Sequence, residues 1–248
     1  MLSIFISFWA VFIGWIVQGF IGLGSGIIAT AILLFFFNAK AVVVSLSIIA
    51  LLGTIYLSVA NFKGNFYLKE IFLLLLFSFV GAGIGSYFLE ILNHKTVEAF
   101  FGLFVVLTGI YDFISHKRNI KLPEKHKYLF AVFTGTVGGF ISGLIGGAGP
   151  LYALYLNQFF HSKEDFKFVI SFVFAVLNIE RIVFYLWSSE LRDFFYSEII
   201  IPAVPAVFLG AFIGNFLTKS VSSTVFKELV SISIILFGFY FIYQGFLM

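Results

Sequence analysis

Two glycine-rich segments contain the residue types that could bind an anion. They run from Gln18 to Gly26 and from Ser142 to Pro150, and each precedes a short apolar stretch that we expect to be helical. The free N–H groups and the positive dipole end of a helix start favour negative charge. In membrane proteins, however, glycines can also serve close helix packing alone. The residues expected to contact an anion at the two tips are Gln18, Gly22, Gly24, Ser25, Gly26, Gly146, Gly147 and Gly149.

A second polar group, Asn178, Glu180 and Arg181, interrupts an otherwise apolar stretch. Ionisable residues at membrane depth cost at least about 2.5 to 3.5 kcal/mol each, so they normally face a cavity or a partner. Arg181 is a candidate counter-charge for an anion, and Asn178 is a candidate neutral donor. Alternatively, Glu180 and Arg181 neutralise each other, or Arg181 extends to the membrane surface near Trp187. Glu180 is the one carboxylate that suggests a proton relay.

Enzyme chemistry has little support. The chain has no Cys, and its four His are expected in loops, so neither a thiolate site nor a buried His ligand or general base is expected. Gly24-Ser25-Gly26 does not match the Gly-x-Ser-Gly pattern of intramembrane serine proteases, because Leu23 precedes it. No Walker motif indicates ATP coupling within the chain. We expect no catalytic residue, metal or cofactor, and no nucleic-acid partner.

The composition predicts an all-α integral membrane protein. Of 248 residues, 61% are hydrophobic and 11% are charged, with a mean hydropathy of +1.09, whereas soluble domains carry roughly 25% charged residues. Uncharged runs near 20 residues favour helices over the alternating strands of a barrel. Residues 1–18 are expected to form a retained helix. Six further spans are expected at 41–60, 71–89, 96–115, 168–187, 199–218 and 229–247.

The two halves of the chain repeat each other. The matching pairs are Gly19 to Gly26 with Gly143 to Pro150, Gly81 to Gly85 with Gly210 to Gly214, and Gly109 to Tyr111 with Gly238 to Tyr240. The offset is 124 residues at the first pair and 129 at the other two, which one small insertion explains. We therefore expect a first membrane repeat at 1–115, a cytoplasmic linker at 116–127 and a second repeat at 128–248. Each consists of a glycine-broken region and three long helices.

The arms that follow the glycines, 27–38 and 151–160, are too short to span alone. Twelve helical residues reach about 18 Å, against a hydrocarbon core of about 30 Å. Each broken region is therefore either one kinked crossing or a re-entrant hairpin.

Positive charge distinguishes these models, because cytoplasmic loops are enriched in Lys and Arg. Two hairpins leave three loop charges, Lys40, Lys95 and Arg192, on one side and eleven on the other. The eleven are Lys63, Lys69, Lys117, Arg118, Lys121, Lys125, Lys127, Lys163, Lys167, Lys219 and Lys227. Two single crossings divide the same charges eight to six. We therefore predict hairpins, a cytoplasmic linker and both termini outside.

A hairpin plus three spans gives an odd number of crossings, so the second repeat is inverted relative to the first. Inverted repeats with broken helices are typical of secondary transporters, which bind substrate at the repeat interface.

The chain resembles the sulfite exporter TauE/SafE family over nearly its whole length. The likeness rests on the order and spacing of Gly22 to Gly26, Gly146 to Pro150, Asn178 to Arg181, Gly210 to Gly214 and Gly238 to Tyr240. The resemblance implies a bacterial or archaeal inner-membrane permease for small anions, including sulfite and organosulfonates such as sulfoacetate.

We therefore expect a multi-pass secondary transporter whose partners are the lipid bilayer and a small inorganic or organosulfur anion. Alternating access would move the anion, with a proton or another ion as a possible coupling partner. Two alternatives stay open: a passive anion channel that uses the same tips as a filter, and a membrane subunit without transport.

Overall fold

A computed structural model describes residues 1–115 and 127–218, except 157 and 161, and this described part is helical throughout. Its helices are α1 (Leu2–Ile21), α2 (Ser25–Leu33), α3 (Ala39–Asn61), α4 (Leu68–Ile91), α5 (His94–Ser115), α6 (Lys127–Ile145), α7 (Gly149–Leu156), α8 (Lys163–Trp187), the short 3₁₀ helix η2 (Arg192–Phe194) and α9 (Ser197–Leu217).

Six helices of the described chain are long and apolar enough to cross a membrane: α1, α3, α4, α6, α8 and α9. Four of them correspond to the expected spans 41–60, 71–89, 168–187 and 199–218. The expected span 96–115 lies in α5, and the span expected at 229–247 lies outside the described residues. The retained helix expected at 1–18 corresponds to α1, whereas α6, the first arm of the second broken region, was not among the expected spans. The spanning stretches of α1 and α6 have 20 and 18 residues and reach about 30 and 27 Å.

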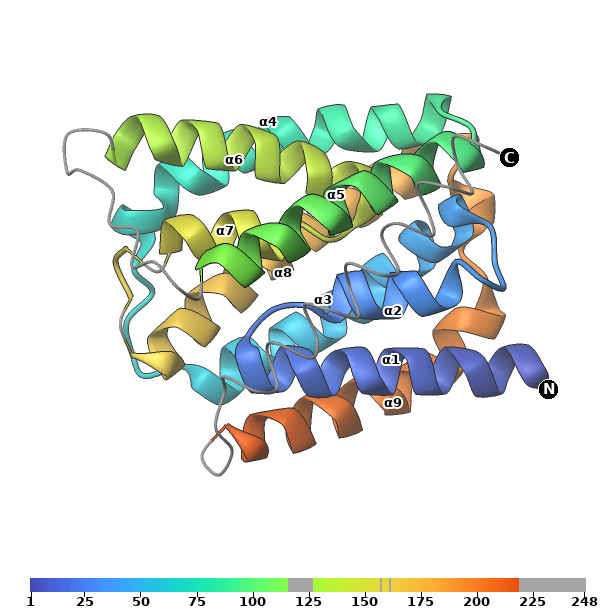
Figure 1. Cartoon of the computed structure of the whole chain (residues 1–248), viewed down its shortest axis with the longest axis horizontal. Coiled ribbons are helices and arrows are strands. Elements are labelled where there is room, and N and C mark those ends of the chain that lie inside the picture. Colours follow the sequence, from blue (N-terminus) through green and yellow to red (C-terminus); the bar gives the residue numbers. More distant parts are fainter. Residues whose placement is uncertain (116–126, 157, 161, 219–248) are drawn as a thin grey trace.

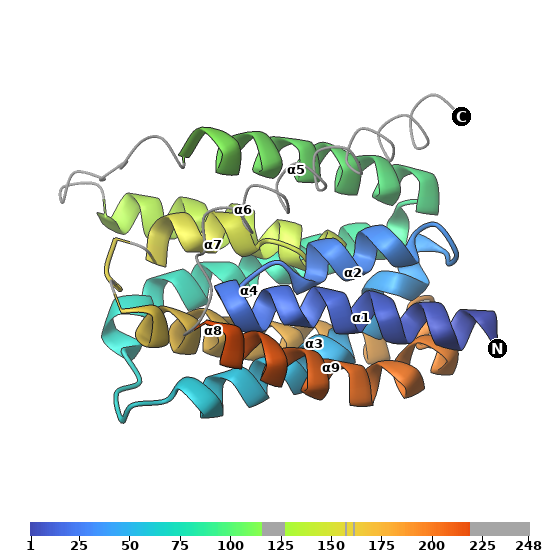
Figure 2. The same cartoon turned by 60° about the horizontal axis from the view of Figure 1, so that its bottom comes forward.

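Each broken region reverses the direction of the chain (Figure 1). α1 begins at one end of the bundle and stops short of the other, and α2 returns toward the end where α1 began. α6 starts at the opposite end, and α7 turns back toward that end. The α2–α3 and α4–α5 turns and η2 lie at one end of the bundle, whereas the α3–α4 turn and the starts of α6 and α8 lie at the other. Figure 2 shows α5 along one edge of the bundle and α9 along the opposite edge.

Glycine permits the breaks. α1 ends at Gly22 with φ 96°, α2 begins after Gly24 with φ 112°, and α6 ends at Gly146 with φ 78°. These left-handed conformations are costly for residues with a Cβ atom. At both helix ends the glycine N–H donates to the carbonyl four residues earlier, from Gly22 to Gln18 at 2.7 Å and from Gly146 to Ser142 at 2.9 Å.

Small residues bring the first helix of each half against a later helix of the other half. α1 packs on α9, and α4 packs on α6. A Cβ atom on Gly19 would come within 2.5 Å of the Ala211 carbonyl, and one on Gly143 would overlap the Ala82 carbonyl. Such backbone contact is typical of small residues at membrane helix interfaces. The two halves are therefore interlocked and not merely adjacent.

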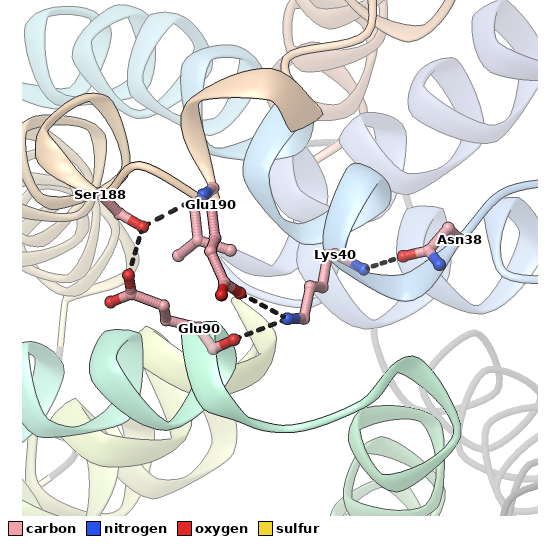
Figure 3. A network of polar contacts seen from close by, with 6 residues as sticks. Asn38, Lys40, Glu90, Ser188 and Glu190 are labelled. Carbon is pink, nitrogen blue, oxygen red and sulfur yellow. Dashed lines mark hydrogen bonds and ion pairs between the residues drawn. The ribbon is translucent and has the colours of Figure 1, made fainter.

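A polar network joins three elements at one end of the bundle (Figure 3). Lys40 Nζ donates to the Glu90 carbonyl at the end of α4 (2.6 Å) and lies 3.8 Å from Glu190 Oε2. Ser188 Oγ donates to Glu90 Oε1 at 2.8 Å, and Asn38 caps α3 by accepting from the Lys40 N–H at 2.9 Å. The network fixes the start of α3 against α4 and the segment after α8.

The α4–α6 contact predicts an asymmetric response to alanine. A Cβ atom on Gly85 would overlap the Phe140 carbonyl, whereas one on Gly83 would meet only Glu180 Oε1 at 3.4 Å. We expect Gly85→Ala to lose about 1 to 3 kcal/mol of stability through overpacking. Gly83→Ala, its matched control, should leave the melting temperature in detergent unchanged or slightly raised. Equal melting temperatures for both variants would contradict the close α4–α6 contact.

Candidate functional site

The two glycine-rich tips meet at a small cavity inside the bundle. Its volume is about 40 Å³, which is room for roughly three waters or an ion of a few heavy atoms. The lining residues are Gln18, Gly24, Ser25, Gly26, Ile27, Ala50, Thr54, Ser142, Gly146, Gly147, Ala148, Gly149, Phe174, Asn178 and Arg181. They come from the two broken regions, from α3 and from α8. The cavity is therefore a junction of both halves.

Gln18 connects the two sides of the first break. Its Oε1 accepts hydrogen bonds from the N–H and the hydroxyl of Ser25, each at 3.1 Å, and its Nε2 donates to the Gly22 carbonyl at 2.9 Å. The orientation of the amide follows from its partners, since an N–H needs an acceptor and a carbonyl needs a donor. Gln18 is 2% exposed, so its polar atoms depend on these bonds. The side chain thus stabilises the tip.

The second tip lies directly against the first and against Arg181. A Cβ atom on Gly26 would come within 2.6 Å of the Gly146 carbonyl, and one on Gly149 within 3.2 Å of the Leu23 Cβ. A Cβ atom on Gly146 would lie 3.1 Å from Arg181 Nη2. Glycine at these positions lets the two backbones and the guanidinium share one small volume.

Arg181 is a buried cation held by neutral groups. It is 2% exposed. Nη1 donates to Asn178 Oδ1 at 2.9 Å, Nε donates to the Tyr185 hydroxyl at 3.1 Å, and Nη2 donates to the Val43 carbonyl at 3.4 Å. Tyr185 in turn donates to the Gly143 carbonyl at 2.9 Å. No carboxylate of the described chain forms an ion pair with Arg181, although burying an unpaired charge is costly.

Nine of the ten residues expected to bind an anion line this cavity, and the exception is Gly22. Gly22 instead ends α1 and lies against Lys167, whose Cγ is 3.0 Å from the position of a Cβ atom there. The alternative of an Arg181 that extends to the membrane surface is wrong, because its guanidinium lies inside the bundle. Mutual neutralisation is also wrong: Glu180 points toward Gly83 of α4 and forms no ion pair with Arg181 within the described residues.

Six lining residues were absent from the expected set: Ile27, Ala50, Thr54, Ser142, Ala148 and Phe174. Ser142 could have been found, because the repeat offset of 124 residues equates it with Gln18. Nothing in the sequence distinguishes Ala50, Thr54 or Phe174 from the other residues of two apolar spans. Thr54 even satisfies its hydroxyl within its own helix, by donating to the Ala50 carbonyl at 2.6 Å.

The comparisons with known proteins give one match. A family model described as "Sulfite exporter TauE/SafE" matches residues 6–241, which is nearly the whole chain. Neither the curated proteins nor the solved structures gave a match.

The role of Gln18 within the tip can be tested by stability. Gln18→Ala leaves the Ser25 N–H and the Gly22 carbonyl without partners, which costs about 1 to 3 kcal/mol for each group. We expect the melting temperature in detergent to fall by roughly 4 °C or more. A Gln18→Ala protein as stable as wild type would exclude this bracing role.

Proposed function

Because the chain belongs to the sulfite exporter TauE/SafE family, we propose that it is a secondary transporter that carries a small sulfur oxyanion, sulfite or an organosulfonate, by alternating access. The six apolar helices of the described residues make it a multi-pass membrane protein of a transporter family.

The observation that carries this proposal is the unpaired charge of Arg181 at the cavity. Three of the five guanidinium N–H donors have neutral acceptors, and the described residues offer the other two none. A planar guanidinium binds oxyanions in a bidentate manner and stays protonated. An oxyanion in the cavity would therefore supply both the missing charge and the missing acceptors.

The tips would complete the binding site. The first-turn N–H groups of α2 and α7 have no acceptor within their own helices, and both helix starts line the cavity with Arg181. We assign the anion to Gly24, Ser25, Gly26, Gly146, Gly147 and Gly149, with Asn178 and Arg181 from α8. Gln18 would contribute by shaping the first tip, since its polar atoms are already used there.

Reciprocal packing supports two inverted repeats, each with a re-entrant hairpin. Gly214 lies against the Ile16 carbonyl, and Gly85 lies against the Phe140 carbonyl. In the same way, Gly210 lies against the Phe12 carbonyl and Gly81 against the Thr136 carbonyl. The corresponding glycines are 129 residues apart and the corresponding carbonyls are 124 residues apart, which are the two offsets found in the sequence. The opposite directions of α1 and α6 in Figure 1 agree with inversion. Alternating access would then move one set of helices about the shared cavity.

The charge distribution supports an orientation. Lys63 and Lys69 flank the α3–α4 turn, at the end of the bundle opposite the α2–α3 turn, the α4–α5 turn and η2. The latter three carry Lys40, Lys95 and Arg192. By the positive-inside rule we assign the α3–α4 end and the linker 116–127 to the cytoplasm, and both termini to the outside of an inner membrane.

The orientation can be tested with single cysteines, because the natural chain has none. Ser189 follows α8 and Asn65 lies between α3 and α4, and both are exposed. We expect a membrane-impermeant maleimide to label Ser189→Cys in intact cells, whereas Asn65→Cys should react only after permeabilisation. The reverse pattern would invert the assignment, and labelling of both from outside would contradict the hairpins.

The binding role of Arg181 can be tested by ligand-induced stabilisation. Sulfite, thiosulfate, sulfate, sulfoacetate, taurine and chloride would be titrated against the purified protein in detergent. A bound oxyanion should raise the melting temperature of wild type in a concentration-dependent manner. Arg181→Gln should weaken that binding about tenfold to a hundredfold, because charge-assisted hydrogen bonds contribute about 1.5 to 3 kcal/mol.

Arg192→Gln serves as the matched control, since the Arg192 side chain is 61% exposed. It should bind like wild type. The oxyanion function would be abandoned if no anion stabilised wild type, and the assigned site would be wrong if Arg181→Gln bound equally well. Unitary currents instead of saturable counterflow would indicate a channel.

A further inference from the structure

Buried polar atoms without partners gather where α4, α6, α7 and α8 meet, apart from the cavity lining. The Ser78 and Tyr152 hydroxyls and Glu180 Oε2 have no hydrogen-bond partner among the described residues. Ser78 and Tyr152 are both fully buried. Unsatisfied buried polar atoms are uncommon in folded proteins and often indicate a functional group.

Adjacent glycines of α6 hold the two hydroxyl residues. A Cβ atom on Gly138 would lie 3.4 Å from the Tyr152 hydroxyl, and one on Gly139 would lie 2.8 Å from the Ser78 Cα. Glu180 approaches from α8, with Oε1 3.4 Å from the Cβ position of Gly83 on α4. The Tyr152 hydroxyl lies close to Ser78 and within electrostatic range of Glu180. The three side chains therefore form one polar group.

Glu180 forms no ion pair within the described residues. Arg181 is the charged group of the described chain that acts on its carboxylate, from the same helix. Facing it, α4 presents Gly83 and α7 presents the neutral Tyr152. The Arg181 guanidinium itself bonds Asn178, Tyr185 and Val43. Among the described residues, an ionised carboxylate here has neither an ion-pair partner nor a donor for Oε2.

We propose that Glu180 is a proton-binding site that couples proton transfer to anion transport, with Tyr152 and Ser78 as its hydrogen-bonding partners. This inference rests on the proposed function. One proton adds to the carboxylate to give a neutral carboxyl, whose O–H then donates to a neighbouring hydroxyl. One proton leaves when the carboxylate forms again, so no other reactant is required.

The position of Glu180 beside Arg181 gives the direction of coupling. An anion at Arg181 is repelled by an ionised Glu180 and not by a protonated one. Linkage is reciprocal, so a bound anion also favours the bound proton. Proton and anion are therefore carried together in the same direction, and binding of the anion should strengthen about tenfold when Glu180 is protonated.

Proteoliposomes test this coupling with radiolabelled sulfite. In wild type, an acidic exterior should drive sulfite accumulation above equilibrium. Glu180→Gln mimics the permanently protonated carboxyl, so it should abolish this accumulation and keep sulfite counterflow at equal pH within about twofold of wild type. Glu198→Gln is the matched control, because Glu198 is exposed in the first turn of α9; it should behave like wild type. Protonation of sulfite itself affects all three proteins equally.

The possible results separate the two proposals. If Glu180→Gln still accumulates sulfite, or loses counterflow as well, the coupling role is overturned. If wild type shows no sulfite flux, the proposed substrate fails, and infrared spectroscopy then tests the proton site without a substrate. A protonated-carboxyl band that appears in wild type as the pH falls, and is absent from Glu180→Gln alone, would support Glu180; an unchanged band in that variant would overturn it.

Discussion

The positive charge of Arg181 has to be accommodated inside the bundle, where no carboxylate of the described residues forms an ion pair with it, and the surrounding architecture follows from this constraint. Neutral oxygens of Asn178, Tyr185 and Val43 hold the guanidinium. Tyr185 is fixed in turn by a carbonyl of α6. Glycine at position 146 lets the second tip approach the charge. Elements of both halves thus depend on one side chain, which is the arrangement expected where a ligand must be recognised from two sides.

The two tips solve the same problem with different chemistry. At the first, Gln18 joins the helix end to the next helix start through three hydrogen bonds. At the second, Ser142 occupies the matching position and is too short to bridge the break in the same way. Arg181 lies against this second tip, with Nη2 3.1 Å from the position of a Cβ atom on Gly146. The approximate symmetry of the backbone is therefore broken by side chains at the cavity, so the two tips present different surfaces to a ligand.

Much of this arrangement could be predicted from the sequence, because glycine clusters and interruptions by charge are rare signals in an apolar chain. The tips, Asn178 and Arg181 were found in this way. The directions in which Glu180 and Arg181 point could not be predicted. Successive helical residues point about 100° apart, and the helix that packs on each face is decided by tertiary packing. Gly22 was expected at the cavity because it lies among glycines that do line it, but its left-handed conformation ends α1 instead. The helix expected at 1–18 covers most of α1, whereas α6 was missed because its apolar stretch contains several glycines and lies between a charged linker and the second break.

The pairing of α1 with α9 has a consequence for biogenesis. α1 leaves the ribosome well before α9, the helix that it packs against, which begins at Ser197. At about 5 to 20 residues per second, roughly 10 to 40 seconds separate the synthesis of the two. During that time the small-residue face of α1 has to be covered by lipid, by the insertion machinery or by another nascent helix. Neither half can complete its packing alone, so a chain arrested midway would expose this face and become a target for membrane quality control.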